Sequence, residues 1–142
     1  MEPTCLAIIL CDYVIEDRAT RNKSLIGIFN RIHSASFPAH HPRMILFLSL
    51  TDGRGKTDLE VFLERGETRR EIFKAGGQVA FQDPKSVIDL VFDLRGLRFD
   101  EPGPYVAGVR TKSGKVLAER LFHVEKTQTP HPPGGQEPQG QG

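Results

Sequence analysis

A Gly-Lys-Thr tripeptide, Gly55 to Thr57, could do chemistry because these residues can end a phosphate-binding loop. Such a loop has the pattern G-x-x-x-x-G-K-[ST], in which the first glycine lets the chain wrap the phosphates and a following helix points its amides at them. Position 50 is Leu50 rather than glycine, and the residues after Thr57 alternate as a strand does. We therefore expect no phosphate site but a β-hairpin turn at Asp52 and Gly53, since glycine tolerates the positive φ of tight turns.

Side chains suited to a transition metal gather in one segment, residues 33–43, which contains three histidines: His33, His40 and His41. Adjacent histidines on an extended chain point to opposite sides, and the two prolines of the segment stiffen it rather than fold it around an ion. We therefore expect a polar connection between two strands, with no metal or other cofactor. The alternative is a metal- or small-ligand-binding site, or an enzyme site, that joins these histidines to Asp12 or Cys11.

The other reactive side chains lack the spacing that catalysis needs. Asp89 and Asp93 share a strand face, but four strand residues place them about 13 Å apart. Glycoside hydrolysis requires roughly 5 to 9.5 Å between its carboxylates. No serine lies in a G-x-S-x-G motif, and neither Cys5 nor Cys11 has a recognisable catalytic surrounding. These observations favour a protein that is not an enzyme.

The sequence contains short apolar runs, separated by turn residues every 8 to 14 positions. These runs are the elements that would position the histidine, carboxylate and cysteine side chains. The runs are rich in β-branched, aromatic and leucine residues and show little helical periodicity, a pattern typical of an all-β domain. We predict about eight strands, near residues 4–15, 24–32, 44–50, 58–64, 87–94, 97–99, 102–109 and 115–124.

Length and charge restrict the classes of function. The 142 residues have the length of one domain, and 19 Lys and Arg against 18 Asp and Glu leave a formal charge of +1. This balance argues against binding of nucleic acid. The apolar runs fall far short of the roughly 20 residues of a membrane-spanning helix, and the N-terminus lacks the pattern of a secretory signal. We expect a cytoplasmic protein that binds neither nucleic acid nor membrane.

The C-terminal segment, residues 126–142, differs from the rest in composition. It holds four of the ten prolines and four of the fourteen glycines, and no residue that could anchor a core. This composition predicts a disordered tail rich in Pro, Gly and Gln. We therefore divide the chain into a β-sandwich domain at 1–125 and a tail at 126–142.

Several apolar side chains lie on strand faces that would not be needed to form a single core. Leu25 and Phe29 share one face of their strand, and Phe47 and Phe62 lie on the less crowded sides of theirs. If one sheet face lacks a covering layer, these residues form a surface for a partner or a dimer. The alternative is that the two sheets of a sandwich use all of them in the core.

The segment FDEPGPYVA, residues 99–107, resembles the corner of an immunoglobulin-like sandwich. At such a corner a tyrosine opens the penultimate strand and its hydroxyl bonds to the upstream backbone; Tyr105, after Gly103, would take this role. Ala107 stands where an antibody domain has its second cysteine, so only the architecture carries over. The resemblance implies an immunoglobulin-like antiparallel β-sandwich.

A set of longer motifs resembles a family of small uncharacterised bacterial proteins, over residues 4–125. The motifs are CDYVIED at 11–17, SLIGIFNRI at 24–32, FPAHHPRM at 37–44, PGPY at 102–105 and RLFHV at 120–124. That family is a domain of unknown function, so the resemblance implies no catalytic residues.

We expect from these observations a non-enzymatic protein-binding or assembly module. Two alternatives stay open. One is the ligand-binding protein or enzyme with its site at 33–43, and the other is a purely structural homo-oligomer joined by sheet edges or faces.

Overall fold

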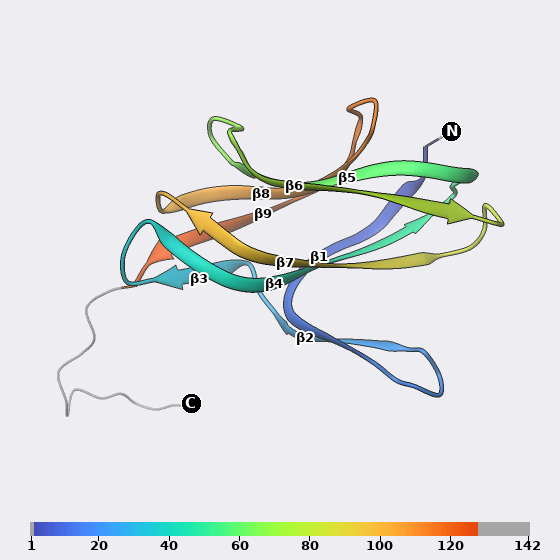
Figure 1. Cartoon of the computed structure of the whole chain (residues 1–142), viewed down its shortest axis with the longest axis horizontal. Coiled ribbons are helices and arrows are strands. Elements are labelled where there is room, and N and C mark those ends of the chain that lie inside the picture. The colour runs from blue at the N-terminus through green and yellow to red at the C-terminus, as the bar shows by residue number, and fades with distance from the viewer. Residues whose placement is uncertain (1, 128–142) are drawn as a thin grey trace.

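The computed structural model describes residues 2–127, which fold into nine β-strands in two sheets (Figure 1). The four-stranded sheet has the order β2-β1-β4-β7, with bounds β2 (Lys23–Ile28), β1 (Thr4–Glu16), β4 (Ala39–Thr51) and β7 (Ile88–Phe99). The five-stranded sheet has the order β3-β9-β8-β5-β6, with bounds β3 (Arg31–Ser34), β9 (Val116–Lys126), β8 (Gly103–Thr111), β5 (Gly55–Arg65) and β6 (Glu71–Phe81). Neighbouring strands are antiparallel except β3 and β9. The predicted all-β sandwich is confirmed.

Alternating side chains of the two sheets form one core between them. The inner face of the four-stranded sheet contributes Leu10, Leu46 and Leu94, and the five-stranded sheet contributes Leu59 and Val61, all buried. Three rings close one end of this core, with centroid distances of 4.9 Å for Phe99–Tyr105, 5.8 Å for Tyr105–Phe122 and 6.0 Å for Phe99–Phe122. Period-two alternation thus places one side of each strand in the core.

Three details of the predicted strand pattern were wrong. The run at 24–32 is two strands, β2 and β3, which lie in different sheets, and the runs at 87–94 and 97–99 form the single strand β7. Strand β6 was missed because Gly76 and Gly77 interrupt its apolar pattern and most of its side chains are exposed, as an edge strand allows. The tail expected from residue 126 begins inside β9, and residues 128–142 lie outside the described part of the chain.

The hairpin predicted at Asp52 and Gly53 is also wrong, because β4 and β5 belong to different sheets. The chain crosses between the sheets here, and the positive φ angles fall at Asp52 and Gly55, not at Gly53. A Cβ on Gly53 would lie 2.2 Å from a ring carbon of Phe81, so any larger residue at this position would clash with the Phe81 ring. Gly55 begins strand β5, which pairs with β6, so the tripeptide forms no phosphate loop.

Within residues 2–127, no helical segment has the length and apolar character that a membrane span requires.

We predict that Gly53→Ala lowers the free energy of unfolding by about 1–3 kcal/mol, the usual cost of overpacking, because the new methyl group meets the Phe81 ring. The control is Gly77→Ala, whose Cβ has no atom closer than 3.9 Å and whose φ is not positive. Urea denaturation of both variants checks this. Equal stability of Gly53→Ala and Gly77→Ala would show that the contact with Phe81 carries no constraint.

Candidate functional site

The outward side of the four-stranded sheet, which is the side away from the core, is lined by apolar side chains. Strand register puts Phe47 between Ile9 and Val91, and Cys11 between Ile28 and Ile45. Tyr13 pairs with Ile26, and Ile15 follows two residues on. We refer to these nine residues as the apolar outer face: Ile9, Cys11, Tyr13, Ile15, Ile26, Ile28, Ile45, Phe47 and Val91.

The apolar outer face holds five of the nine large apolar side chains that are exposed in residues 2–127. Their exposed fractions are 54% for Tyr13, 57% for Ile15, 40% for Ile26, 56% for Ile28 and 40% for Val91. Single exposed apolar residues are normal on a protein surface, but a contiguous group marks a contact site. This face is therefore the candidate functional site.

Part of the apolar outer face lies on a hairpin that projects from the sandwich. Pairing of β1 with β4 ends at Cys11 and Ile45, whereas pairing of β1 with β2 continues to Glu16 and Lys23. Beyond Cys11 the hairpin therefore has no third strand, and Figure 1 shows β1 bending out of the sheet so that the hairpin tip lies below the end at which β7 begins. A two-stranded hairpin in water is marginally stable by itself, so contact with another surface would stabilise this one.

The four surface candidates named from sequence have different environments. Phe47 lies at the centre of the apolar outer face and is 8% exposed. Leu25 is half-buried on the opposite side of the projecting hairpin, and Phe29 is half-buried where β2 ends. Phe62 faces outward on the other sheet but is 1% exposed. The structure thus brings only Phe47 to the candidate site.

Phe62 is buried by charged side chains of its own sheet. The Arg110 guanidinium lies 4.4 Å from the ring centroid and pairs with Glu60 at 2.6 Å and with Glu64 at 3.3 Å. Gly108 leaves room for the ring, since a Cβ there would lie 2.2 Å from it. The outer face of the five-stranded sheet is therefore closed at this point by its own residues.

The histidine segment contributes a shallow hollow of about 290 Å³. Strand alternation separates the adjacent pair, because His40 is exposed while His41 is half-buried and lines the hollow with Asp12, Phe29 and His33. Within residues 2–127 no group of three histidine, cysteine, aspartate or glutamate side chains could hold a metal ion. The described chain therefore does not assemble the metal-site alternative from these histidines.

His41 is the unusual member of this hollow. Its Nε2 atom is buried without a hydrogen-bond partner, and its ring meets Phe29 edge-on at 6.2 Å. Burial lowers the pKa of His41 below its usual value, although the nearby Asp12 carboxylate acts in the opposite direction. The folded protein therefore prefers the neutral imidazole.

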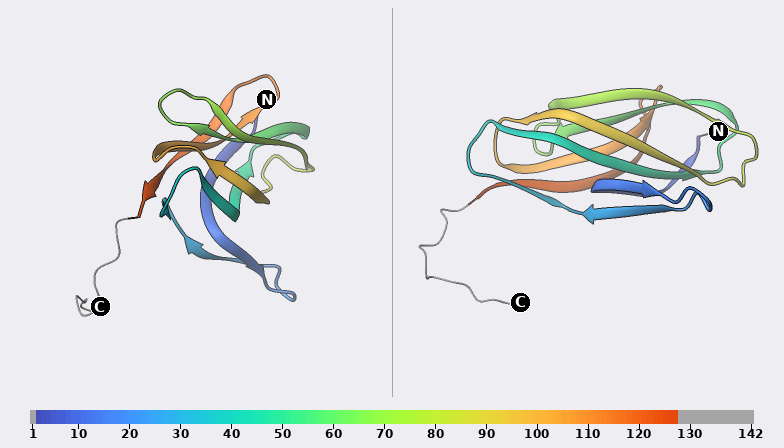
Figure 2. Two further views of the ribbon diagram at one scale, coloured as in Figure 1. Left: turned by 60° about the vertical axis from the view of Figure 1, so that its left-hand side comes forward. Right: turned by 60° about the horizontal axis from the view of Figure 1, so that its bottom comes forward.

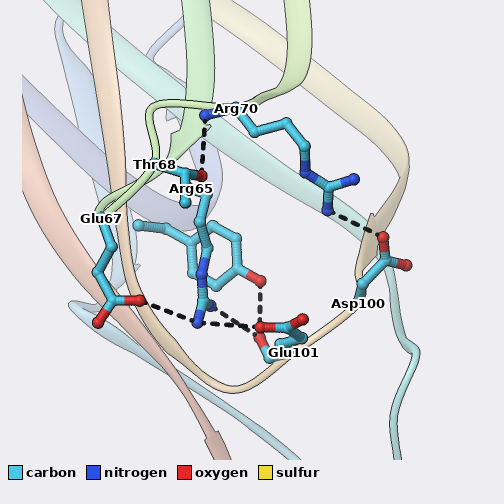
Figure 3. Close-up of polar contacts among 7 residues, drawn as sticks. Arg65, Glu67, Thr68, Arg70, Asp100 and Glu101 are labelled. Atoms are coloured by element: carbon cyan, nitrogen blue, oxygen red, sulfur yellow. Dashed lines mark hydrogen bonds and ion pairs between the residues drawn. The ribbon is translucent and has the colours of Figure 1, made fainter.

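A second hollow, of about 370 Å³, lies at the corner before β8 (Figure 3). The Tyr105 hydroxyl donates a hydrogen bond of 2.6 Å to the Glu101 carbonyl. Arg65 lies 5.0 Å from the Tyr105 ring centroid and contacts the Glu101 and Glu67 carboxylates at 3.4 and 3.5 Å. Gly103 has a φ of +135°, a conformation that residues with a side chain rarely adopt, which explains the glycine at this position.

The charges around this corner neutralise one another. Arg70 binds the Asp100 carboxylate at 3.1 Å, Arg98 binds its other oxygen at 2.8 Å, and these two bonds lower the pKa of Asp100. Each arginine drawn in Figure 3 has a carboxylate partner, so the hollow offers no free charge to a ligand. These paired charges indicate a structural role for the corner.

Tyr13, Ile15, Ile26 and Ile28 were not identified as site residues from sequence. Their signal was present, because both runs keep apolar residues at every second position towards the hairpin tip. Recognising it required the register between β1 and β2, which puts the two rows on one side.

Comparisons with known proteins give one family match, no curated match and a distant structural likeness. The model of a family of unknown function (DUF6941) matches residues 6–125. No curated protein matches the chain. A crystal structure of selenomethionine-labelled beta-glucosidase from Kluyveromyces marxianus is 16% identical with a TM-score of 0.44, over 66% of this chain and 14% of that chain. The family match extends from β1 to β9.

We predict that Tyr105→Phe lowers the free energy of unfolding by about 1 kcal/mol, because it removes the hydrogen bond from the Tyr105 hydroxyl to the Glu101 carbonyl. Tyr13→Phe is the matched control, since Tyr13 is 54% exposed to water. Chemical denaturation of both variants measures the difference. An unchanged midpoint for Tyr105→Phe would contradict a stabilising role for the corner.

The buried imidazole predicts how stability depends on pH. The pKa of His41 is lower in the folded than in the unfolded state, so its stabilising contribution is complete above the unfolded value, about 6.5, and is lost as pH falls. We expect His41→Phe to reduce the loss of unfolding free energy between pH 7 and pH 5. His40→Phe, at the exposed neighbouring position, should leave the pH profile unchanged, and parallel profiles for all three proteins would refute this assignment.

Proposed function

The chain belongs to a family of unknown function (DUF6941), and we propose that this member is a non-enzymatic module that binds another protein through its apolar outer face. The observation that carries the proposal is the exposure of Tyr13, Ile15, Ile26 and Ile28 on one side of the hairpin, next to the buried Cys11. Burial of apolar area contributes roughly 25 cal/mol per Å², so covering such a face favours association.

The layout of the face supports a protein as the partner. Its apolar centre is bordered at β7 by a polar rim, in which Arg43 and Arg95 both bind the Asp93 carboxylate at 3.0 Å. An apolar centre with a polar rim, and aromatic side chains among the apolar ones, is typical of protein partners. A pleated sheet face suits a broad partner better than a small ligand, which needs a concave pocket.

We place this role in the cytoplasm. Cys5 and Cys11 are both free and lie on the same strand, and Cys11 is buried as a thiol, a state that reducing compartments preserve. A bacterial origin stays a prediction from the sequence motifs.

Affinity capture tests the proposal directly. The tagged full-length chain, a truncation after Thr127 and the variant Ile26→Glu are used to capture proteins from host lysate, with quantitative mass spectrometry as the readout. We expect a stoichiometric partner that the wild type retains and Ile26→Glu loses by tenfold or more, because a charge in an apolar interface is costly to desolvate.

The matched control is Leu121→Glu. Leu121 is 56% exposed and lies on β9 in the other sheet, so it introduces the same charge on the far side of the molecule. A partner retained equally by Ile26→Glu and Leu121→Glu would contradict a role for the apolar outer face. Dependence on the truncated segment would assign binding to residues after Thr127 instead.

A further inference from the structure

We propose that His41 is a latch that holds the projecting hairpin against the sandwich, and that protonation of its imidazole releases the hairpin. This inference rests on the proposed function, because the hairpin carries the exposed part of the apolar outer face and its release would regulate binding there. The right-hand view of Figure 2 shows β2 at the lower margin of the fold, with β1 next to it.

The hairpin has few attachments to the rest of the molecule. β2 pairs only with β1, and pairing of β1 with β4 ends at Cys11 and Ile45. Among residues 2–127, no side-chain hydrogen bond or ion pair joins residues 12–28 to a strand outside the hairpin. At its base the ring of Phe29, the residue after β2, meets the His41 ring of β4 at a centroid distance of 6.2 Å. His41 therefore lies where the hairpin joins the sandwich.

The surroundings of His41 suit a neutral imidazole. Its Nε2 atom is buried without a hydrogen-bond partner, and its neighbours Phe29 and Leu97 are uncharged. A neutral ring can leave this nitrogen as an unused acceptor, whereas an imidazolium has a proton on both nitrogens and would bury an unpaired N–H. An unpaired buried donor on a charged ring is costly, so protonation favours a state in which the ring reaches water. Moving the ring outward separates it from Phe29.

Charged groups face the hollow of His41 from two strands. The Asp12 carboxylate of β1 stabilises the charged ring and so opposes release, but burial is the larger effect and lowers the pKa of His41. Arg31 and His33 of β3 also line the hollow, and both pair with the Glu125 carboxylate of β9. The closed hairpin is therefore fully stabilised above the pKa of a free imidazole, about 6.5, and loses this stabilisation as pH falls.

Hydrogen exchange of the full-length chain, followed by NMR, tests the latch at one amide. The Phe29 N–H donates to the Leu10 carbonyl at 3.0 Å, so its protection factor reports release at the hairpin base. We expect this protection factor to fall roughly threefold or more between about pH 7.5 and pH 5.5. The Thr111 N–H, which donates to the Lys115 carbonyl at the β8–β9 turn, should keep its protection.

Four variants assign the effect to one group. His41→Phe should remove the pH dependence, because it keeps an aromatic ring against Phe29 and cannot gain a proton. Asp12→Asn should steepen the fall, because it removes the carboxylate that stabilises the charged ring. His40→Phe and His33→Gln are matched controls and should keep the wild-type profile.

Two results would overturn the latch directly: a constant Phe29 protection factor in the wild type, or an unchanged fall in His41→Phe. A flat profile in His33→Gln would also overturn it, since the titrating group would then be His33. A milder fall in Asp12→Asn than in the wild type would contradict the sign of the argument and decides the matter even if His41→Phe fails to fold.

Partner capture at both pH values separates this inference from the proposed function. We expect the wild type to lose its partner severalfold at about pH 5.5, and His41→Phe to retain it. A partner that is sensitive to Ile26→Glu but retained equally at both pH values would overturn regulation by His41 and leave the proposed function intact. If no captured partner is sensitive to Ile26→Glu, the proposed function fails alone, and the latch stands or falls with the exchange of the Phe29 amide.

Discussion

The four-stranded sheet is apolar on both sides, but the described chain contains only one other sheet to cover it. Residues 44–48 of β4 are all buried, so neither side of this central strand faces water freely. The inner side is covered by the five-stranded sheet. On the outer side Ile45 and Phe47 are also buried, whereas Ile28 and Val91 are exposed. This imbalance between apolar faces and covering layers determines where the molecule can make contacts.

The outer faces of the two sheets carry similar aromatic residues in different surroundings. Phe62 on β5 and Phe47 on β4 are both aromatic residues on the outer side of a central strand. Arg110, from the neighbouring strand, lies over Phe62 and is held there by Glu60 and Glu64. Phe47 is flanked by Ile9 and Val91 instead, so no charged group closes its surface. Whether charged side chains cover an outward-facing aromatic ring therefore depends on the residues of the neighbouring strands, and not on the strand that carries the ring.

Sequence therefore predicted the fold class better than the site. Alternation along single strands was enough to identify a β-sandwich, and the corner at Tyr105 was recognisable because its bond is local, from Tyr105 to Glu101. The turn at Gly53 was assigned wrongly because local turn preferences do not say whether the next strand joins the same sheet. The apolar outer face depends on register between β1, β2 and β4, which are pairings between segments that single-strand patterns do not contain. Leu25 and Phe29 were expected to share a partner surface with Phe47, but they lie away from the apolar outer face.

The edge strand of the same sheet is irregular in a way that disfavours strand addition. β2 is an edge strand, and free edges usually invite pairing with another chain. Gly27 interrupts this edge with a φ of +71°, and its missing side chain leaves the space that Asp12 occupies, since a Cβ would lie 2.2 Å from the Asp12 carboxylate. A left-handed residue at the fifth of the six positions of β2 breaks the regular row of amides and carbonyls that an added strand would need. The hairpin thus keeps its apolar side available while its edge resists non-specific pairing, which is the combination required for a specific interface rather than aggregation.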